Sequence, residues 1–223
     1  MTRLPTQIFC FEPGEFEKPA QIRFLQITAP LADLTPEEIS ELSEVEEIVF
    51  LPSASLATQA DTIPGGLFRG LRNVKKIKIL NKKIKRLDAH SFCDMPKLVE
   101  LDLSGNQIEA IDRKAFHHLP RLTSLSLSNN SLRQVKTDYF RDLKGLSRLD
   151  LSGNRISKLE TAAFGGNAHL TSLNLSRNRI DFFNEMLFSG LGNLGALGLE
   201  RNPLDRVKPS HFRFLGKNTA IFS

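Results

Sequence analysis

The sequence has no tryptophan, a single tyrosine and only two cysteines in 223 residues. Two cysteines are too few to hold together a disulfide-rich domain, so the fold must be stabilised by a core of apolar side chains. Several strands are expected to separate Cys10 from Cys93, and we interpret the two residues as semi-buried thiols rather than as a bridge. Hydrophobic residues make up 40% of the chain, which is enough for such a core.

No apolar run approaches the roughly 18 residues that a membrane-spanning helix needs, so no membrane span is predicted in this chain. The opening residues, MTRLPTQIFCF, lack an apolar stretch followed by a small-residue cleavage site, so no secretory signal is predicted either. Charge of neither sign dominates, because 25 acidic residues oppose 30 basic ones. The net charge of +5 allows weak attraction to acidic surfaces. The near balance of the two signs, with aromatic residues that are mostly core phenylalanines, argues against a nucleic-acid partner.

Residues typical of catalytic and metal sites are not grouped in the sequence. The serines lack a neighbouring base that could activate them, and no cysteine and histidine stand at the spacing of a zinc site. The histidines fall on different return segments: His90, His117, His118, His169 and His211. We therefore predict no enzyme activity, no metal and no cofactor.

A repeated motif of 24 residues dominates the chain instead. Consecutive units follow the pattern LxxLxLxxNxLxxLxxxxFxxLxx and begin at Leu98, Leu122, Leu146, Leu170 and Leu194. Within each unit, an alternation such as Leu101-Asp102-Leu103 predicts a short strand whose leucines point inward and whose other residues face out. A repeat of this length predicts a solenoid in which neighbouring units stack their strands into a parallel sheet.

Two further columns recur at the same interval. An asparagine follows each strand, where it can satisfy buried backbone groups of its own turn and of the next one. The expected ladder consists of Asn106, Asn130, Asn154, Asn178 and Asn202. A phenylalanine stands near the end of each unit, and its ring can bury about 150–250 Å² in the core. The expected column consists of Phe68, Phe92, Phe116, Phe140, Phe164, Phe188 and Phe212.

Aligning these columns predicts one domain with eight repeats. Residues 1–21 are expected to form an N-terminal cap and residues 218–223 a short C-terminal tail. The repeats are predicted at 22–44, 45–73, 74–97, 98–121, 122–145, 146–169, 170–193 and 194–217. The second repeat is five residues longer than the others, which predicts a protruding loop at 53–62. Thr35 and Pro36 predict a short helix in the first repeat, and Lys82 stands at the ladder position of the third.

The motifs LDLSGNQI, LSLSNNSL, LDLSGNRI and LNLSRNRI, with the phenylalanine column, resemble the typical subclass of leucine-rich repeat proteins. This subclass occurs in Toll-like receptor ectodomains, Slit-like adhesion proteins and secreted insect immune proteins. Over about residues 22–217, the resemblance implies an α/β horseshoe with a parallel sheet on its concave face. It also implies extracellular recognition of macromolecules, in innate immunity or cell adhesion. The four-cysteine caps of many extracellular members are missing, which leaves the location open.

Strand alternation identifies the residues on the concave face of the predicted sheet. From Leu122 onward these residues are mostly small, as at Ser124 and Ser126, and we interpret that half as a scaffold. The first three strands place large apolar and charged residues there: Phe24, Gln26, Glu47, Val49, Leu51, Lys76, Lys78 and Leu80. An apolar centre with a charged rim is typical of a protein-binding site. Sequence drift in irregular end repeats explains the same residues equally well.

Opposite charges stand in neighbouring units of the same region. Six acidic residues lie within Glu37–Glu47 and seven basic residues within Lys75–Arg86. These groups either compensate one another on a solvated face or form a patch that attracts an acidic protein or a sulfated glycan.

We therefore predict a non-catalytic recognition module, secreted or part of an ectodomain, that binds a protein partner through the concave face. A first alternative is a cytoplasmic scaffold or regulatory subunit, which fits the missing signal and the lone thiols. A second is a structural matrix or assembly component that pairs through its C-terminal end. There Leu215, Ile221 and Phe222 have no further repeat to cover them.

Overall fold

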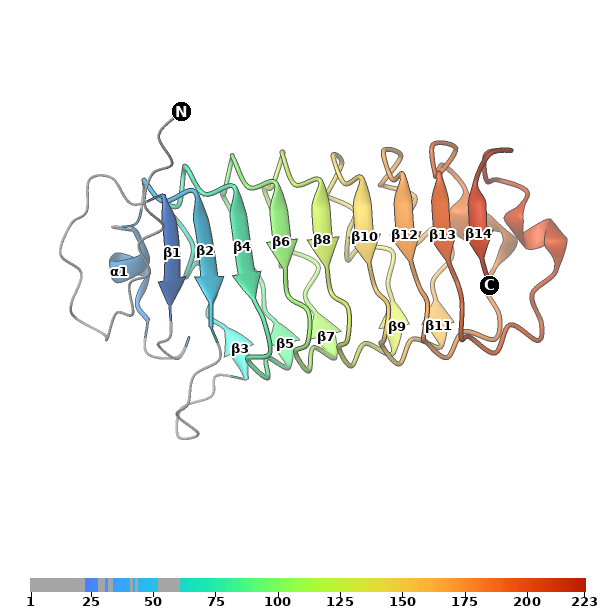
Figure 1. Ribbon diagram of the computed structural model, residues 1–223, viewed down its shortest axis with the longest axis horizontal. Helices are drawn as coiled ribbons and strands as arrows, with labels where there is room; N and C mark the ends of the chain where they lie inside the picture. Colours follow the sequence, from blue (N-terminus) through green and yellow to red (C-terminus); the bar gives the residue numbers. More distant parts are fainter. Residues whose placement is uncertain (1–22, 28–30, 32–33, 41, 43, 52–60) are drawn as a thin grey trace, which may run out of the picture.

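The computed structural model describes residues 23–27, 31, 34–40, 42, 44–51 and 61–223. The expected N-terminal cap, Cys10 and nearly all of the expected loop at 53–62 lie outside these residues. Within them the chain forms a solenoid whose units follow one another along its long axis (Figure 1). The predicted architecture, a solenoid with a parallel sheet, is confirmed.

One strand from each unit joins a parallel sheet in chain order. Its nine strands are β1 (Phe24–Ile27), β2 (Glu47–Phe50), β4 (Lys76–Ile79), β6 (Glu100–Asp102), β8 (Ser124–Ser126), β10 (Arg148–Asp150), β12 (Ser172–Asn174), β13 (Ala196–Gly198) and β14 (Ala220–Phe222). Residues in register across neighbouring strands lie on the same face of the sheet, so that Leu101, Leu125 and Leu149 all point inward and are buried. The alternation read from the sequence therefore places the side chains correctly.

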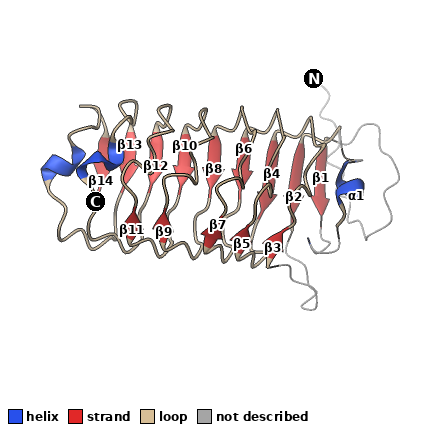
Figure 2. Cartoon of the chain, turned by 180° about the vertical axis from the view of Figure 1, so that it is seen from behind, coloured by secondary structure: helices blue, strands red, loops and turns tan. Residues whose placement is uncertain are grey.

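Shorter strands follow β2, β4, β6, β8 and β10 at one edge of the solenoid (Figures 1 and 2). One small sheet contains β3 (Thr62–Ile63), β5 (Arg86–Leu87) and β7 (Ala110–Ile111), and another contains β9 (Gln134–Val135) and β11 (Lys158–Leu159). Helical segments in the described residues are the α-helix α1 (Pro36–Ser40) and the 3-10 helices η2 (Glu185–Phe188) and η3 (Pro209–Phe212).

The predicted helix start in the first repeat is confirmed. The Oγ1 of Thr35 accepts a hydrogen bond from the backbone N–H of Glu38 at 3.3 Å. The Glu38 carboxylate in turn accepts from the N–H of Thr35 at 2.9 Å. This reciprocal capping satisfies two backbone donors that the first turn of α1 would otherwise leave free.

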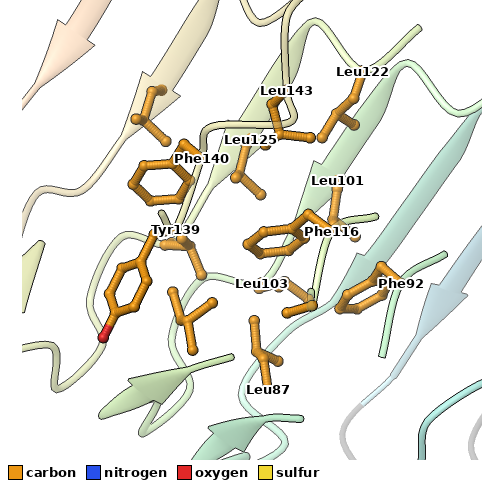
Figure 3. Packing of buried hydrophobic residues seen from close by; sticks show 14 of the residues in the cluster. Leu87, Phe92, Leu101, Leu103, Phe116, Leu122, Leu125, Tyr139, Phe140 and Leu143 are labelled. Carbon is orange, nitrogen blue, oxygen red and sulfur yellow. The ribbon is translucent and has the colours of Figure 1, made fainter. Parts of the chain in front are cut away.

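The phenylalanine column forms the spine of the core. Phe68 and Phe92 stack with ring centroids 5.3 Å apart, and Phe116 lies 6.4 Å from Phe140 in the same arrangement. Figure 3 shows Phe92, Phe116 and Phe140 packed near inward leucines of the sheet, such as Leu101 and Leu125. Leucine and phenylalanine from successive units thus make one continuous apolar core that runs the length of the solenoid.

The side chains of the asparagine column bond to the backbone of two successive units. The Nδ2 of Asn130 donates to the carbonyl oxygens of Leu103 and Leu127, each at 3.0 Å. Its Oδ1 accepts from the N–H of Ile108 at 2.9 Å. Each asparagine therefore bonds to the preceding unit as well as to its own. These bonds satisfy buried backbone N–H and carbonyl groups where the chain turns after each strand.

The residues expected as a C-terminal tail contain a strand. Residues Ala220–Phe222 form β14, which pairs in parallel with β13 and continues the register of the sheet. The side chains of Ile221 and Phe222 are 40% and 52% exposed, because β14 lies at the edge of the sheet. The sequence signal for this strand was weak, since Ile221 and Phe222 are not followed by the turn residues of the motif.

Candidate functional site

The eight candidate residues of the first three strands come together on the outward face of the sheet. Register places Phe24, Glu47 and Lys76 in one row. Gln26, Val49 and Lys78 form the next row. Leu51 and Leu80 follow directly after β2 and β4. We call these eight residues the N-terminal sheet surface.

Each residue of this surface is half-buried. The long side chains of neighbouring strands shield one another, so the apolar groups of Phe24, Val49, Leu51 and Leu80 are neither core nor fully solvated. Adding a partner would remove the remaining apolar area from water, which contributes to binding at about 25 cal/mol per Å² before the costs of association.

Ion pairs link the charged residues across the strands. Lys78 Nζ lies 3.7 Å from Glu47 Oε1, and Lys76 Nζ lies 3.5 Å from the carboxylate of Glu100. Lys75 Nζ lies 2.9 Å from Glu46. The hydrogen bond from Lys75 holds the pKa of the Glu46 carboxyl below its usual range, and the positive charges of Lys75 and Arg23 act in the same direction.

These ion pairs favour mutual neutralisation as the explanation of the acidic residues within Glu37–Glu47 and the basic residues within Lys75–Arg86. Lys85 also lies 2.9 Å from Asp61, and Arg86 lies 3.2 Å from Asp88. Opposite charges at such distances largely cancel each other's field, and solvent and salt screen what is left. A strong positive patch for a sulfated glycan is therefore less well supported than a mixed, partly apolar surface for a protein.

The regular half of the sheet presents much smaller groups. Its outward residues include Ser124, Ser126, Ser172, Ala196 and Gly198. The polar residues that end these strands serve their own turns. Asp102, Asp150 and Asn174 each accept a hydrogen bond from the backbone N–H two residues later, at 2.9–3.0 Å. The aspartate of the LDLSGN motif is thus accounted for by local structure.

Three exposed apolar side chains were not singled out from the sequence. Val99 is 37% exposed and lies beside β6, next to the N-terminal sheet surface. Phe182 and Met186 are 43% and 40% exposed on the return segment before and within η2. Strand alternation in the repeat predicts the outward position of Val99. The residues around Phe182 do not follow the repeat motif, so their exposure could not be predicted from it.

Lys82 stands at the ladder position of the third repeat, but its side chain makes none of the ladder hydrogen bonds. Its Nζ is buried and has no hydrogen-bond partner among the described residues, and desolvation lowers the pKa of the ammonium group. Asn106 bonds instead to the backbone N–H of Lys82, at 2.9 Å. Cys93 is a buried thiol that forms no disulfide. The described residues contain no group of three or more side chains able to hold a metal ion.

The fold and its motifs define the class of protein. A sequence model of the leucine-rich repeat matches residues 57–108, 97–156 and 144–204. These matches cover more than half of the chain, which therefore belongs to the leucine-rich repeat family. A search of curated proteins finds no match. In the described part of the chain, no helix combines the length and the hydropathy that crossing a membrane requires.

Solved structures place the chain near the Toll family. It is similar to a Toll-like receptor solved as the "TLR13-ssRNA13 complex", with 29% identity and a TM-score of 0.73 over 81% of this chain. It is also similar to Drosophila Toll in the Toll–Spatzle complex, with 25% identity and a TM-score of 0.70 over 80% of this chain. This chain spans only 25% and 23% of the length of those two chains.

Proposed function

We propose that this chain is a non-catalytic recognition module of an extracellular protein, and that it binds a protein partner through the N-terminal sheet surface. The observation that carries the proposal is the group of half-buried apolar side chains, Phe24, Val49, Leu51 and Leu80, held between ion-paired residues on one face of a rigid sheet. Flat, partly apolar surfaces with a charged rim suit protein partners.

The similarity to Toll-family structures supports this role and an extracellular location. One similar structure contains a protein ligand, Spatzle, and the other contains single-stranded RNA. A protein ligand fits this chain better, because Lys76 and Lys78 pair with carboxylates and leave little positive charge for phosphates. Participation in innate immunity or adhesion rests on the same similarity.

A differential pull-down tests the proposal. The immobilised chain is compared with a Phe24→Ser/Leu51→Ser variant and with an Arg148→Ser/Asp150→Asn variant from the regular half. We expect a partner that is retained by the parent chain and the second variant and depleted on the first. A captured protein that both variants retain equally would place recognition elsewhere on the molecule.

A further inference from the structure

A pocket of about 660 Å³ lies away from the N-terminal sheet surface, on the turns that follow β3, β5 and β7. His90, His117 and His118 line it together with Arg69 and Asp94. The sequence separates these residues, but the solenoid superimposes positions 24 apart, as with Asp94 and His118. None of these residues belongs to the core columns or to the ladder, so repeat packing does not account for them.

The histidines are held in a defined arrangement. The rings of His117 and His118 stack with centroids 3.9 Å apart, and the ring of His90 meets that of His117 edge-on at 6.0 Å. His118 Nδ1 lies 2.9 Å from Asp94, and His117 Nδ1 lies 3.3 Å from Asp142. A carboxylate at each Nδ1 fixes the orientation of the ring and leaves its Nε2 without a hydrogen bond from these partners.

Three residues of the pocket have a left-handed backbone. His90, Asp94 and His118 have φ values of 62°, 57° and 54°. Glycine occupies the equivalent left-handed positions of other units, at Gly66 and Gly70 one unit earlier and at Gly190 three units after His118, and a side chain in this conformation costs free energy that glycine avoids. Left-handed non-glycine residues also recur outside the pocket, as at Asn129 and Arg177, so this conformation alone does not mark the site.

The charges around the pocket balance when the imidazoles are neutral. Arg69 lies 3.9 Å from Asp94, and Arg141 lies 3.9 Å from Asp142. The Cys93 thiol also hydrogen-bonds to Asp94, and burial raises the pKa of that thiol, so it stays neutral. Two arginines therefore face two aspartates, and each histidine that gains a proton adds uncompensated positive charge.

The geometry points to an anion site: we propose that this pocket binds a tetrahedral oxyanion, the phosphate or sulfate group of a ligand, when its histidines are protonated. Protonation converts the free Nε2 atoms of His117 and His118 into donors. It also places like charges on two stacked rings, and an oxyanion that bridges their Nε2 atoms from the open side offsets that repulsion while accepting both hydrogen bonds.

Anion titrations followed by calorimetry and by the histidine NMR signals test the proposal on the full chain. Inorganic phosphate and sulfate are used in separate arms, with a phosphate monoester as a third, at about pH 5.5 and about pH 7.5. Sulfate keeps its charge over this pH range, so any pH dependence of sulfate binding arises from the protein alone. We expect sulfate to bind roughly tenfold or more tightly at the lower pH, with shifts confined to His90, His117 and His118.

Matched variants separate the site from general charge effects. His118→Gln and His117→Gln should each weaken binding by roughly tenfold at the lower pH, whereas His169→Gln, an exposed histidine elsewhere, should leave it unchanged. Thermal melts confirm that each variant is folded. Sulfate affinity that is independent of pH, or equal loss on His169→Gln, overturns the proposal. Tight Zn²⁺ binding at these histidines without any anion effect would also overturn it and assign a metal site instead.

Discussion

The units from Leu98 onward and the three units before them share one backbone plan but use its outward face differently. The regular units carry mostly small residues there, with Arg148 of β10 as an exposed exception, and polar residues such as Asp150 bond to their own turns. The irregular units carry Phe24, Val49 and Leu51 on the same face, among cross-strand ion pairs. Stacking requires only the inward residues, so the outward positions of the early units are free to serve recognition.

The largest difference should appear between inward and outward residues of the regular half. Phe140 is fully buried between Phe116 and Phe164, with ring centroids 6.4 and 6.5 Å away. Phe140→Ala should therefore lower the free energy of unfolding by about 3–5 kcal/mol, because the neighbouring rings cannot close the cavity. Ser126→Ala on the outward face should change it by less than about 0.5 kcal/mol. Denaturant melts that give equal losses for the two variants would mean that the repeat phase is wrong.

A smaller loss is expected in the asparagine ladder. Asn154 accepts from the N–H of Leu132 at 3.0 Å and donates to the carbonyls of Leu127 and Leu151. Asn154→Ala leaves these buried groups without partners and should cost about 2–3 kcal/mol. Asn202→Ala, at the half-buried end of the ladder, should cost less because water can replace the side chain. Chemical denaturation of both variants measures the order, and a larger loss at Asn202 would argue against the ladder as the source.

A substitution in the irregular half is expected to raise the free energy of unfolding rather than lower it. Lys82 buries an ammonium group that has no hydrogen-bond partner in the described residues. Lys82→Asn should raise the free energy of unfolding by about 1 kcal/mol, because an amide fits the ladder position and carries no charge. A destabilised variant at neutral pH would show that the lysine has a stabilising role of its own.

The same substitution predicts a specific pH dependence. Desolvation lowers the pKa of the Lys82 ammonium group in the folded state below the usual lysine value of 10.5. At pH values between the folded and the unfolded pKa of Lys82, the unfolded chain therefore holds more protons than the folded chain. In this range the free energy of unfolding of the parent chain increases with pH relative to that of the variant. The advantage of Lys82→Asn should be complete near neutral pH and disappear as the pH approaches about 10.5. Urea melts at several alkaline pH values measure the difference.

The fold could be predicted from the sequence because its columns repeat in phase. Asn130 and Phe140 occupy the expected positions, since the same backbone geometry in each unit demands the same side chain. The outward rows followed from strand alternation for the same reason. The ion pair between Lys76 and Glu100 did not, because it depends on which rotamers the two exposed side chains adopt across the strands.

Two local features also escaped prediction, for physical reasons. The strand β14 rests on backbone pairing with β13 and has no leucine pattern of its own. The histidine pocket arises because turns 24 residues apart are superimposed, as with Asp94 and His118, while its residues match no position of the motif. Comparing every turn position with the one 24 residues later would have found this second feature.

The most direct test of the central claim is the binding kinetics of the partner identified by the differential pull-down. Phe24→Ser/Leu51→Ser should raise its dissociation rate strongly, because these side chains lose apolar contact in the complex. Lys76→Glu/Lys78→Glu should mainly lower the association rate and alter its salt dependence. Arg148→Ser/Asp150→Asn should leave both rates unchanged. A partner whose kinetics are indifferent to the first two variants but disrupted by the third would contradict the account, because recognition would then lie on the regular half of the sheet.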